Sequence, residues 1–140
     1  MSDDHSQPNL KTSPLDGLHR KLKAKMVGFA GYSMPLQYAG GIIAEHEHTR
    51  TKASLFDVSH MGQISIRGAD AADAMEALVP ADLKGAPVGK AVYTLFTNEE
   101  GGIIDDLIAT VLIDEVFMVV NAARKERDVA HVRDHQIGRA

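Results

Sequence analysis

Two adjacent carboxylates are the residues of this sequence best suited to proton chemistry. Asp105 and Asp106 lie in the run GGIIDDLI that begins at Gly101. Because neighbouring residues of a strand point to opposite faces of a sheet, the two cannot share one proton as a protease dyad does. An inward carboxyl among Ile and Leu has a raised pKa and suits a general base or a cation stabiliser. The alternative, equally open from the residues, is that both only shape a strand edge, although strand interiors are depleted in Asp.

A second group of candidates is the tripeptide His46-Glu47-His48, which contains two metal-ligand types. On a helix, residues i and i+2 point to different faces, so these two histidines cannot chelate one ion. The HExxH motif is absent, and no third ligand is indicated. We therefore expect surface histidines and no metal site.

The segment Phe56–Met61 (FDVSHM) contains the residue types of a hydrolase triad. Neighbours in sequence cannot adopt triad geometry, and no GxSxG motif occurs. Met61 is instead suited to pack on a planar ligand or in a core. The glycines form neither GxxxxGK[ST] nor GxGxxG, so no motif supports nucleotide binding.

Composition narrows the class of protein. The 140 residues are 44% hydrophobic and 24% charged, with a net charge of −4 and no cysteine. This excludes collagen-like, coiled-coil and disordered chains, and also disulfides and Cys-based metal sites. Six acids and no Lys or Arg between residues 98 and 115 disfavour a nucleic-acid partner. The sequence shows neither a membrane-spanning apolar run nor a secretory signal, and we expect a cytoplasmic protein.

The elements that must position these residues follow from hydrophobic spacing and turn signals. A helix beginning at Ser13-Pro14 has an apolar stripe that should face a core, formed by Leu15, Leu18 and Leu22. Residues 27–35 are typical of a short strand or an extended loop. Further helices are predicted over 42–54 and 71–78 and after residue 121, the last two capped by Asp70 and Asn121, with strands over 63–67, 92–97, 103–113 and 116–120.

The last three predicted strands form an antiparallel meander joined by hairpin turns. Helices interspersed with hairpins indicate an α+β fold with flanking helices rather than a doubly wound sheet. Residues 1–13 are predicted to be a disordered polar tail, and residues 14–140 to be the folded part. The final helix offers only Val129, Val132 and Ile137 as larger apolar anchors, so we expect unusually large apolar patches at the surface.

Five blocks share one order and spacing that is highly specific as a set. They are Met26–Tyr38 (MVGFAGYSMPLQY), His48–Arg50 (HTR), Ser54–Met61 (SLFDVSHM), Tyr93–Asn98 (YTLFTN) and Gly101–Leu107 (GGIIDDL). Together they resemble the N-terminal part of the glycine cleavage system T-protein family, which are tetrahydrofolate-dependent aminomethyltransferases. The similarity runs from about Ser13 into the last predicted helix.

The resemblance implies a three-domain fold with tetrahydrofolate in a central channel. Family members take an aminomethyl group from the lipoyl arm of the H-protein, release ammonia and leave methylene on folate N5 and N10. The resemblance thus implies a role in glycine breakdown and one-carbon metabolism, with lipoylated H-protein as partner and tetrahydrofolate as cofactor.

Site residues carry over from the same resemblance. The second Asp of the GGxxDD block, Asp106, corresponds to the catalytic carboxylate, and Met61 and Tyr93 match positions that line the folate pocket. Asn121 corresponds to a further pocket residue. A low-dielectric carboxylate stabilises the iminium cation left when sulfur is expelled, and it can take the proton that folate N10 must lose. Asp106 is expected to point inward, whereas Asp105 is expected to face the other way, in or near water.

Length separates this chain from the family, whose chains are more than twice as long. The later part of those chains supplies an acidic residue and an Arg that hold the pterin and the glutamate tail. We therefore interpret residues 14–140 as an incomplete N-terminal portion of the folate-binding domain, inactive in isolation. Two other functions remain open: a non-catalytic folate-binding protein of iron–sulfur assembly, and the folate domain of a dimethylglycine or sarcosine oxidising enzyme. The VSHM and GGxxDDL blocks favour the aminomethyltransferase.

The histidine pair gives the first testable prediction. Calorimetric titration with zinc should show no tight stoichiometric site, because His46 and His48 lie on different helix faces. A sub-micromolar site that disappears in His46→Ala would contradict this.

Overall fold

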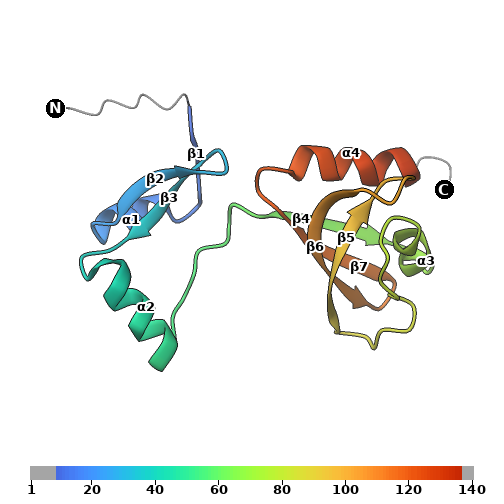
Figure 1. Ribbon diagram of the computed structural model, residues 1–140, viewed down its shortest axis with the longest axis horizontal. Coiled ribbons are helices and arrows are strands. Elements are labelled where there is room, and N and C mark those ends of the chain that lie inside the picture. Colours follow the sequence, from blue (N-terminus) through green and yellow to red (C-terminus); the bar gives the residue numbers. More distant parts are fainter. Residues whose placement is uncertain (1–8, 137–140) are drawn as a thin grey trace. The chain divides into compact units, whose positions relative to one another are not determined.

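The computed structural model describes residues 9–136 and divides the chain into two compact units, residues 1–60 and 61–140. We call them unit 1 and unit 2 and describe each by itself (Figure 1). Both combine helices with a β-sheet, which confirms the α+β class.

Unit 1 is a three-stranded sheet with two helices. The sheet order is β1-β3-β2, with a parallel β1–β3 pair and an antiparallel β2–β3 pair. The β2–β3 hairpin turns at Ala30 and Gly31, whose φ angles of 50° and 80° suit a tight hairpin turn. The strands are β1 (Lys11–Thr12), β2 (Lys25–Phe29) and β3 (Tyr32–Gln37), and the helices are α1 (Asp16–Lys21) and α2 (Gly41–Thr51).

The predicted disordered tail is wrong at its end. Lys11 and Thr12 form β1, which pairs with Tyr32 and Ser33 of β3. The Lys11 amide also donates to the Gly31 carbonyl at 3.0 Å. Backbone hydrogen bonds order this polar segment without any apolar side chain; residues 1–8 lie outside the described part.

The apolar stripe of α1 does not face a core. Leu15, Leu18 and Leu22 are 40–53% exposed, whereas His19 is 4% exposed. The polar residue is the one turned inward because its ring has hydrogen-bonding partners there. The predicted orientation of this helix is therefore wrong.

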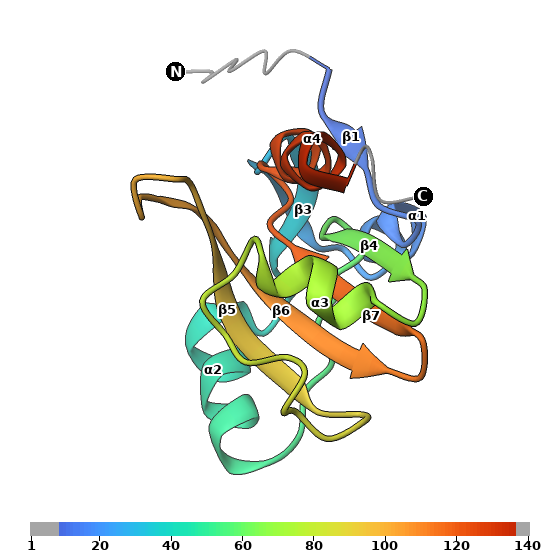
Figure 2. The same cartoon turned by 90° about the vertical axis from the view of Figure 1, so that its right-hand side faces the viewer.

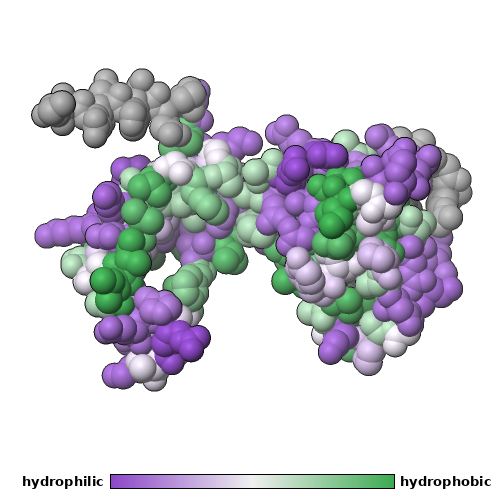
Figure 3. Space-filling model, in the orientation of Figure 1, coloured by the Kyte–Doolittle hydropathy of each residue, from purple (hydrophilic) through white to green (hydrophobic). Residues whose placement is uncertain are grey.

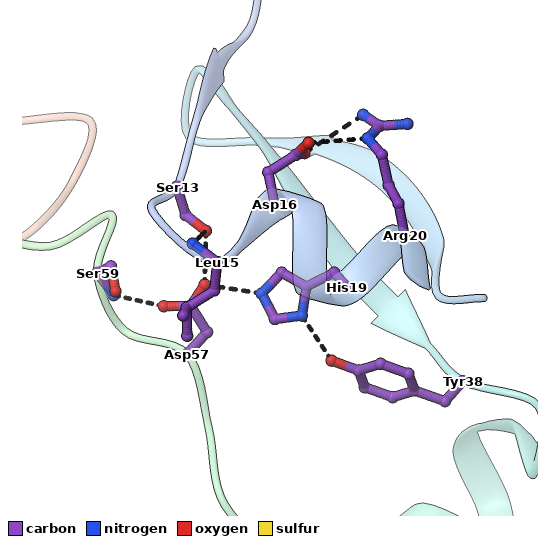
Figure 4. A network of polar contacts seen from close by, with 8 residues as sticks. All are labelled: Ser13, Leu15, Asp16, His19, Arg20, Tyr38, Asp57 and Ser59. Atoms are coloured by element: carbon purple, nitrogen blue, oxygen red, sulfur yellow. Dashed lines mark hydrogen bonds and ion pairs between the residues drawn. The ribbon is translucent and has the colours of Figure 1, made fainter. Parts of the chain in front are cut away.

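Those partners form a network around Asp57 (Figure 4). His19 Nε2 lies 2.8 Å from Asp57 Oδ2, and Nδ1 of the same ring lies 2.7 Å from the Tyr38 hydroxyl. The Ser13 hydroxyl donates to Asp57 Oδ2 at 2.7 Å, and the Ser59 amide donates to Oδ1 at 2.9 Å. Burial alone raises the pKa of Asp57, but these hydrogen bonds outweigh it and hold the pKa well below its ordinary value.

Unit 2 contains a four-stranded antiparallel sheet in the order β4-β7-β6-β5. Its last three strands confirm the predicted meander. The strands are β4 (Gly62–Arg67), β5 (Ala91–Thr97), β6 (Ile103–Leu112) and β7 (Glu115–Val120), and the helices are α3 (Ala71–Glu76) and α4 (Lys125–Gln136).

The core of unit 2 lies on one face of this sheet. Alternate residues of the strands, such as Leu107, Ala109 and Met118, pack against Met75 of α3 and Val132 of α4. Figure 2 shows α3 lying across the sheet in front of β6 and β7. The opposite face is open, which leaves side chains of β5 and β6 at the surface.

Two predicted helix caps are wrong. Asp70 precedes α3 but makes no capping hydrogen bond through its side chain. Asn121 lies before the turn that leads into α4, and its side-chain amide donates to aspartates of β6 instead. Charge-assisted hydrogen bonds to these carboxylates turn the Asn121 side chain towards β6 and away from the free N–H groups at the start of α4.

Large apolar side chains are exposed in both units (Figure 3). In unit 1 the most exposed are Ile43, Leu55 and Phe56. In unit 2 they are Tyr93, Ile103 and Ile113. Within residues 9–136, no helix has the length and apolarity needed to cross a membrane.

The Asp57 network predicts acid sensitivity of unit 1. A carboxyl whose pKa is depressed by folding stabilises the fold above its ordinary pKa of about 3.9, and this contribution is lost as the pH falls towards the folded value. Asp57→Asn should cost about 1.5–3 kcal/mol at neutral pH, since hydrogen bonds to a buried charge are lost. Urea unfolding followed on the amides of β2 and β3 measures this.

The matched control is Asp16→Asn, which breaks the exposed ion pair between Asp16 and Arg20. This pair should contribute less than about 1 kcal/mol. Equal losses for the two variants, or an Asp57→Asn variant that keeps the acid sensitivity of the parent chain, would contradict the assignment.

Candidate functional site

The candidate site lies where β6 begins and β7 ends. In the β6–β7 register Leu107 pairs with Val120, so the next residues along, Asp106 and Asn121, lie at the same end of the sheet. On the other side of β6, Asp106 pairs with Leu95 of β5. Three of the four predicted site residues therefore meet, because Tyr93 lies two residues from Leu95 on β5.

The Asp106 carboxylate is held from both sides. The Tyr93 hydroxyl donates to its Oδ2 at 3.2 Å, and Asn121 Nδ2 donates to its Oδ1 at 2.8 Å. The hydrogen bond to Asp106 and the negative charge of its carboxylate raise the pKa of Tyr93. Both Asp106 and Tyr93 are exposed on the open face of the sheet. The predicted inward position of Asp106 is thus wrong within this chain, although its separation from Asp105 holds.

Asn121 bridges the two aspartates. Besides Asp106 Oδ1, its Nδ2 contacts Asp105 Oδ1 and the Asp106 carbonyl, each at 3.2 Å. One side-chain amide thus spans three acceptors from two successive residues of β6. This geometry fixes Asn121 and restrains the Asp106 carboxylate.

Asp105 does not lie on the exposed face of the sheet, contrary to the prediction. It is half-buried on the face that α4 covers, and its Oδ2 is buried with no hydrogen-bond partner in the described part of the chain. Strand alternation does separate Asp105 from Asp106. Asp105 lies on the same face of β6 as the core residues Leu107 and Ala109, and Asp106 lies on the open face.

Sequence reasoning missed Asp128 of α4. This residue is fully buried, and among residues 9–136 neither carboxylate oxygen has a hydrogen-bond partner. Burial, the nearby negative charge of Asp105 and the hydrogen bond that a protonated Asp128 can donate to Asp105 together raise the pKa of Asp128 to about 7. One signal could have revealed it: Asp128 lies four residues before Val132 and therefore on the helix face that packs on the core.

Met61 lies immediately before Gly62, the first residue of β4, which pairs with Val120. It is half-buried and lies at the same end of the sheet as Asn121. A Cβ on Gly62 would come 2.5 Å from a methyl carbon of Val120. Only glycine permits this close approach of β4 to the end of β7.

The other candidates take no part in this site. His46 and His48 are both exposed on α2, and His48 Nε2 contacts the Ala53 carbonyl. His60 packs edge-on against Phe29 and Tyr32. The histidine that contacts Asp57 is His19, not His60. In the described range 9–136, no three His, Asp or Glu side chains converge as a metal site would require.

Unit 1 also has an open groove of about 870 Å³ between β3, α2 and residues 53–57. Its walls combine apolar side chains such as Leu55 and Phe56 with Tyr38 and Asp57 of the buried network. None of the four predicted site residues lines it.

Comparisons with known proteins identify the family of the chain. The GCVT N-terminal domain family matches residues 15–138. The chain is 46% identical to a mitochondrial aminomethyltransferase of Dictyostelium discoideum over 92% of its length, and 48% identical to an aminomethyltransferase of Rubrobacter xylanophilus over 90%. It covers 32% and 34% of those two proteins, so it spans about a third of the relatives it matches.

A solved structure supports the fold as well. The crystal structure of glycine cleavage system aminomethyltransferase T from Bartonella henselae matches with a TM-score of 0.84 and 37% identity. The match covers 92% of this chain and 36% of that one. With its family profile, relatives and fold in agreement, the chain belongs to the GCVT N-terminal domain family.

Proposed function

We propose that this chain supplies the catalytic carboxylate and part of the folate-binding surface of an aminomethyltransferase of the glycine cleavage system. The observation that carries the proposal is the Asp106 carboxylate, exposed on an open sheet face and held by Tyr93 and Asn121. Its substrates are tetrahydrofolate and the aminomethyl-lipoyl group of the H-protein. The names of its relatives support this reaction class.

The side chains around Asp106 fit a flat, partly apolar ligand. Tyr93 is 68% exposed and lies on the neighbouring strand β5. Its pairing partner Ile108 is 45% exposed and lies two residues after Asp106 on β6. An aromatic ring and an aliphatic side chain beside one anion suit a pterin or aminobenzoyl ring that carries ionisable nitrogens. Bound there, tetrahydrofolate supplies the two nitrogens, N5 and N10, that receive the methylene.

Asp106 serves two purposes in this proposal. Its negative charge stabilises the cation formed when the carbon–sulfur bond of the aminomethyl group breaks. A carboxylate oxygen then accepts the proton released when the new carbon–nitrogen bond forms. Tyr93 and Asn121 keep the carboxylate in place, because each donates to a different oxygen.

The 140 residues by themselves should turn over little. They span about a third of their relatives, and the family resemblance places the groups that hold the pterin and the glutamate tail in the later part. Turnover should therefore be measured in a polypeptide that also contains the later part. Binding and titration can be measured in the 140-residue chain.

Replacing Asp106 tests the catalytic role. Asp106→Asn keeps the shape and removes the charge, so kcat with aminomethylated H-protein should fall by about 10²–10⁴-fold. The Kd for tetrahydrofolate, measured by calorimetry, should change far less. The matched control is Asp114→Asn, an exposed carboxylate in the β6–β7 turn whose φ of 52° asparagine tolerates. Equal kcat for the two variants would exclude Asp106 as the catalytic carboxylate.

A second prediction concerns Tyr93 and needs no substrate. Its pKa is raised by the hydrogen bond to Asp106 and by the negative charge there, so its phenolate should form above the ordinary pKa of about 10. In Asp106→Asn the midpoint should return towards that value. NMR titration of the tyrosine ring carbons measures it, with the parent chain as the reference. An unchanged Tyr93 midpoint would show that the contact is absent in solution.

A further inference from the structure

On the core face of the sheet, the carboxyl groups of Asp105 and Asp128 have too few hydrogen-bond donors for their oxygens. Among the described residues, both oxygens of Asp128 and the Oδ2 of Asp105 are buried with no hydrogen-bond partner. The second oxygen of Asp105 accepts from Asn121. An ionised carboxylate left without donors in a protein interior is costly, so a proton must make up the difference.

The Asp105 carboxyl is close enough to Asp128 for its charge, and a hydrogen bond between the two side chains, to raise the pKa of Asp128. Two carboxylates that meet can only repel, whereas one carboxylic acid donates to the other carboxylate. A single proton thus lets one oxygen of Asp128 donate to Asp105 and removes one of the two negative charges. The same arrangement leaves Asp105 ionised and free to accept from Asn121.

We propose that Asp128 is a positioning residue, which holds one proton between itself and Asp105 and thereby fixes Asn121 and the Asp106 carboxylate. The order of contacts is Asp128, Asp105, Asn121, Asp106. The last step is direct, since Asn121 Nδ2 bonds to Asp105 Oδ1 at 3.2 Å and to Asp106 Oδ1 at 2.8 Å. The shared proton does not depend on the proposed function. Only the catalytic role of the Asp106 carboxylate does.

Other charged groups act on this pair. Arg124 and Arg127, on the chain segment that contains Asp128, lower its pKa, but burial and Asp105 outweigh them and raise it to about 7. His131, one helical turn further along α4, packs edge-on against Phe96. Burial lowers the pKa of His131. Its ring also titrates, so the experiment must distinguish it from the Asp128 carboxyl.

NMR titration of the side-chain carboxyl carbons of the 140-residue chain tests the shared proton. One aspartate signal should titrate near pH 7, as the pKa of Asp128 indicates. The side-chain amide signals of Asn121 should shift with the same midpoint. In Asp128→Asn the amide donates to Asp105 at every pH, so the Asn121 signals should stay fixed across this range.

Asp134→Asn is the matched control, because Asp134 is an exposed carboxylate on the same helix and also acts on His131. It should leave the Asn121 titration unchanged. If Asp128→Asn does not fold, Asp105→Asn serves instead: the charge of Asp105 is gone and the new amide can donate to Asp128, whose signal should then titrate at a clearly lower pH than in the parent chain.

Two results would overturn the proposal. One is that no aspartate signal titrates above about pH 5. The other is that the Asn121 amide signals do not follow the carboxyl titration. Neither readout involves folate or turnover, so a normal titration together with full activity of Asp106→Asn would reject the proposed function and leave the shared proton standing.

The folding stability gives an independent readout. A carboxyl whose pKa is raised by folding is protonated in the folded chain and ionised in the unfolded chain between about pH 4 and 7. Its favourable contribution is present below this window and is lost as the pH rises through it. Unfolding of unit 2 should show this loss in the parent chain and in Asp134→Asn, but not in Asp128→Asn.

Discussion

The antiparallel pairing of β6 with β7 is the constraint on which the candidate site depends. Leu107 pairs with Val120, and this register places Asn121 beside two successive aspartates of β6. A slip of one residue would turn every side chain of the strand to the other face and would exchange the positions of Asp105 and Asp106. The alternating buried residues of both strands hold the register, because a slip would also expose the core.

Two buried aspartates in this chain show opposite responses to the same environment. Asp57 is surrounded by donors from His19, Ser13 and Ser59, which hold its pKa down despite burial. Asp128 has Asp105 beside it, so burial and a like charge raise its pKa. Burial alone therefore does not decide the charge of a carboxyl group; the donors that the fold brings to it do.

Apolar exposure and polar burial are also linked in unit 1. The inward position on α1 is taken by His19, whose ring contacts Tyr38 and Asp57. Since one face of a short helix can pack inward, the three leucines of that helix remain exposed. The hydrogen-bonded His19 ring thus takes the inward position that the leucine spacing predicts for apolar side chains.

The sequence by itself determined the α+β class, the meander and the meeting of Tyr93, Asp106 and Asn121 near one end of it. Alternation and turn residues are local signals, and the family resemblance carries the site positions: Tyr93 and Asp106 lie in two of the five blocks, and Asn121 follows the last predicted strand. Only the tertiary structure decided which face of the sheet is covered. This is why Asp105 was wrongly expected near water and Asp106 inside, and why Asp128 was missed. Burial depends on which distant segment packs on a strand, and no local pattern contains that information.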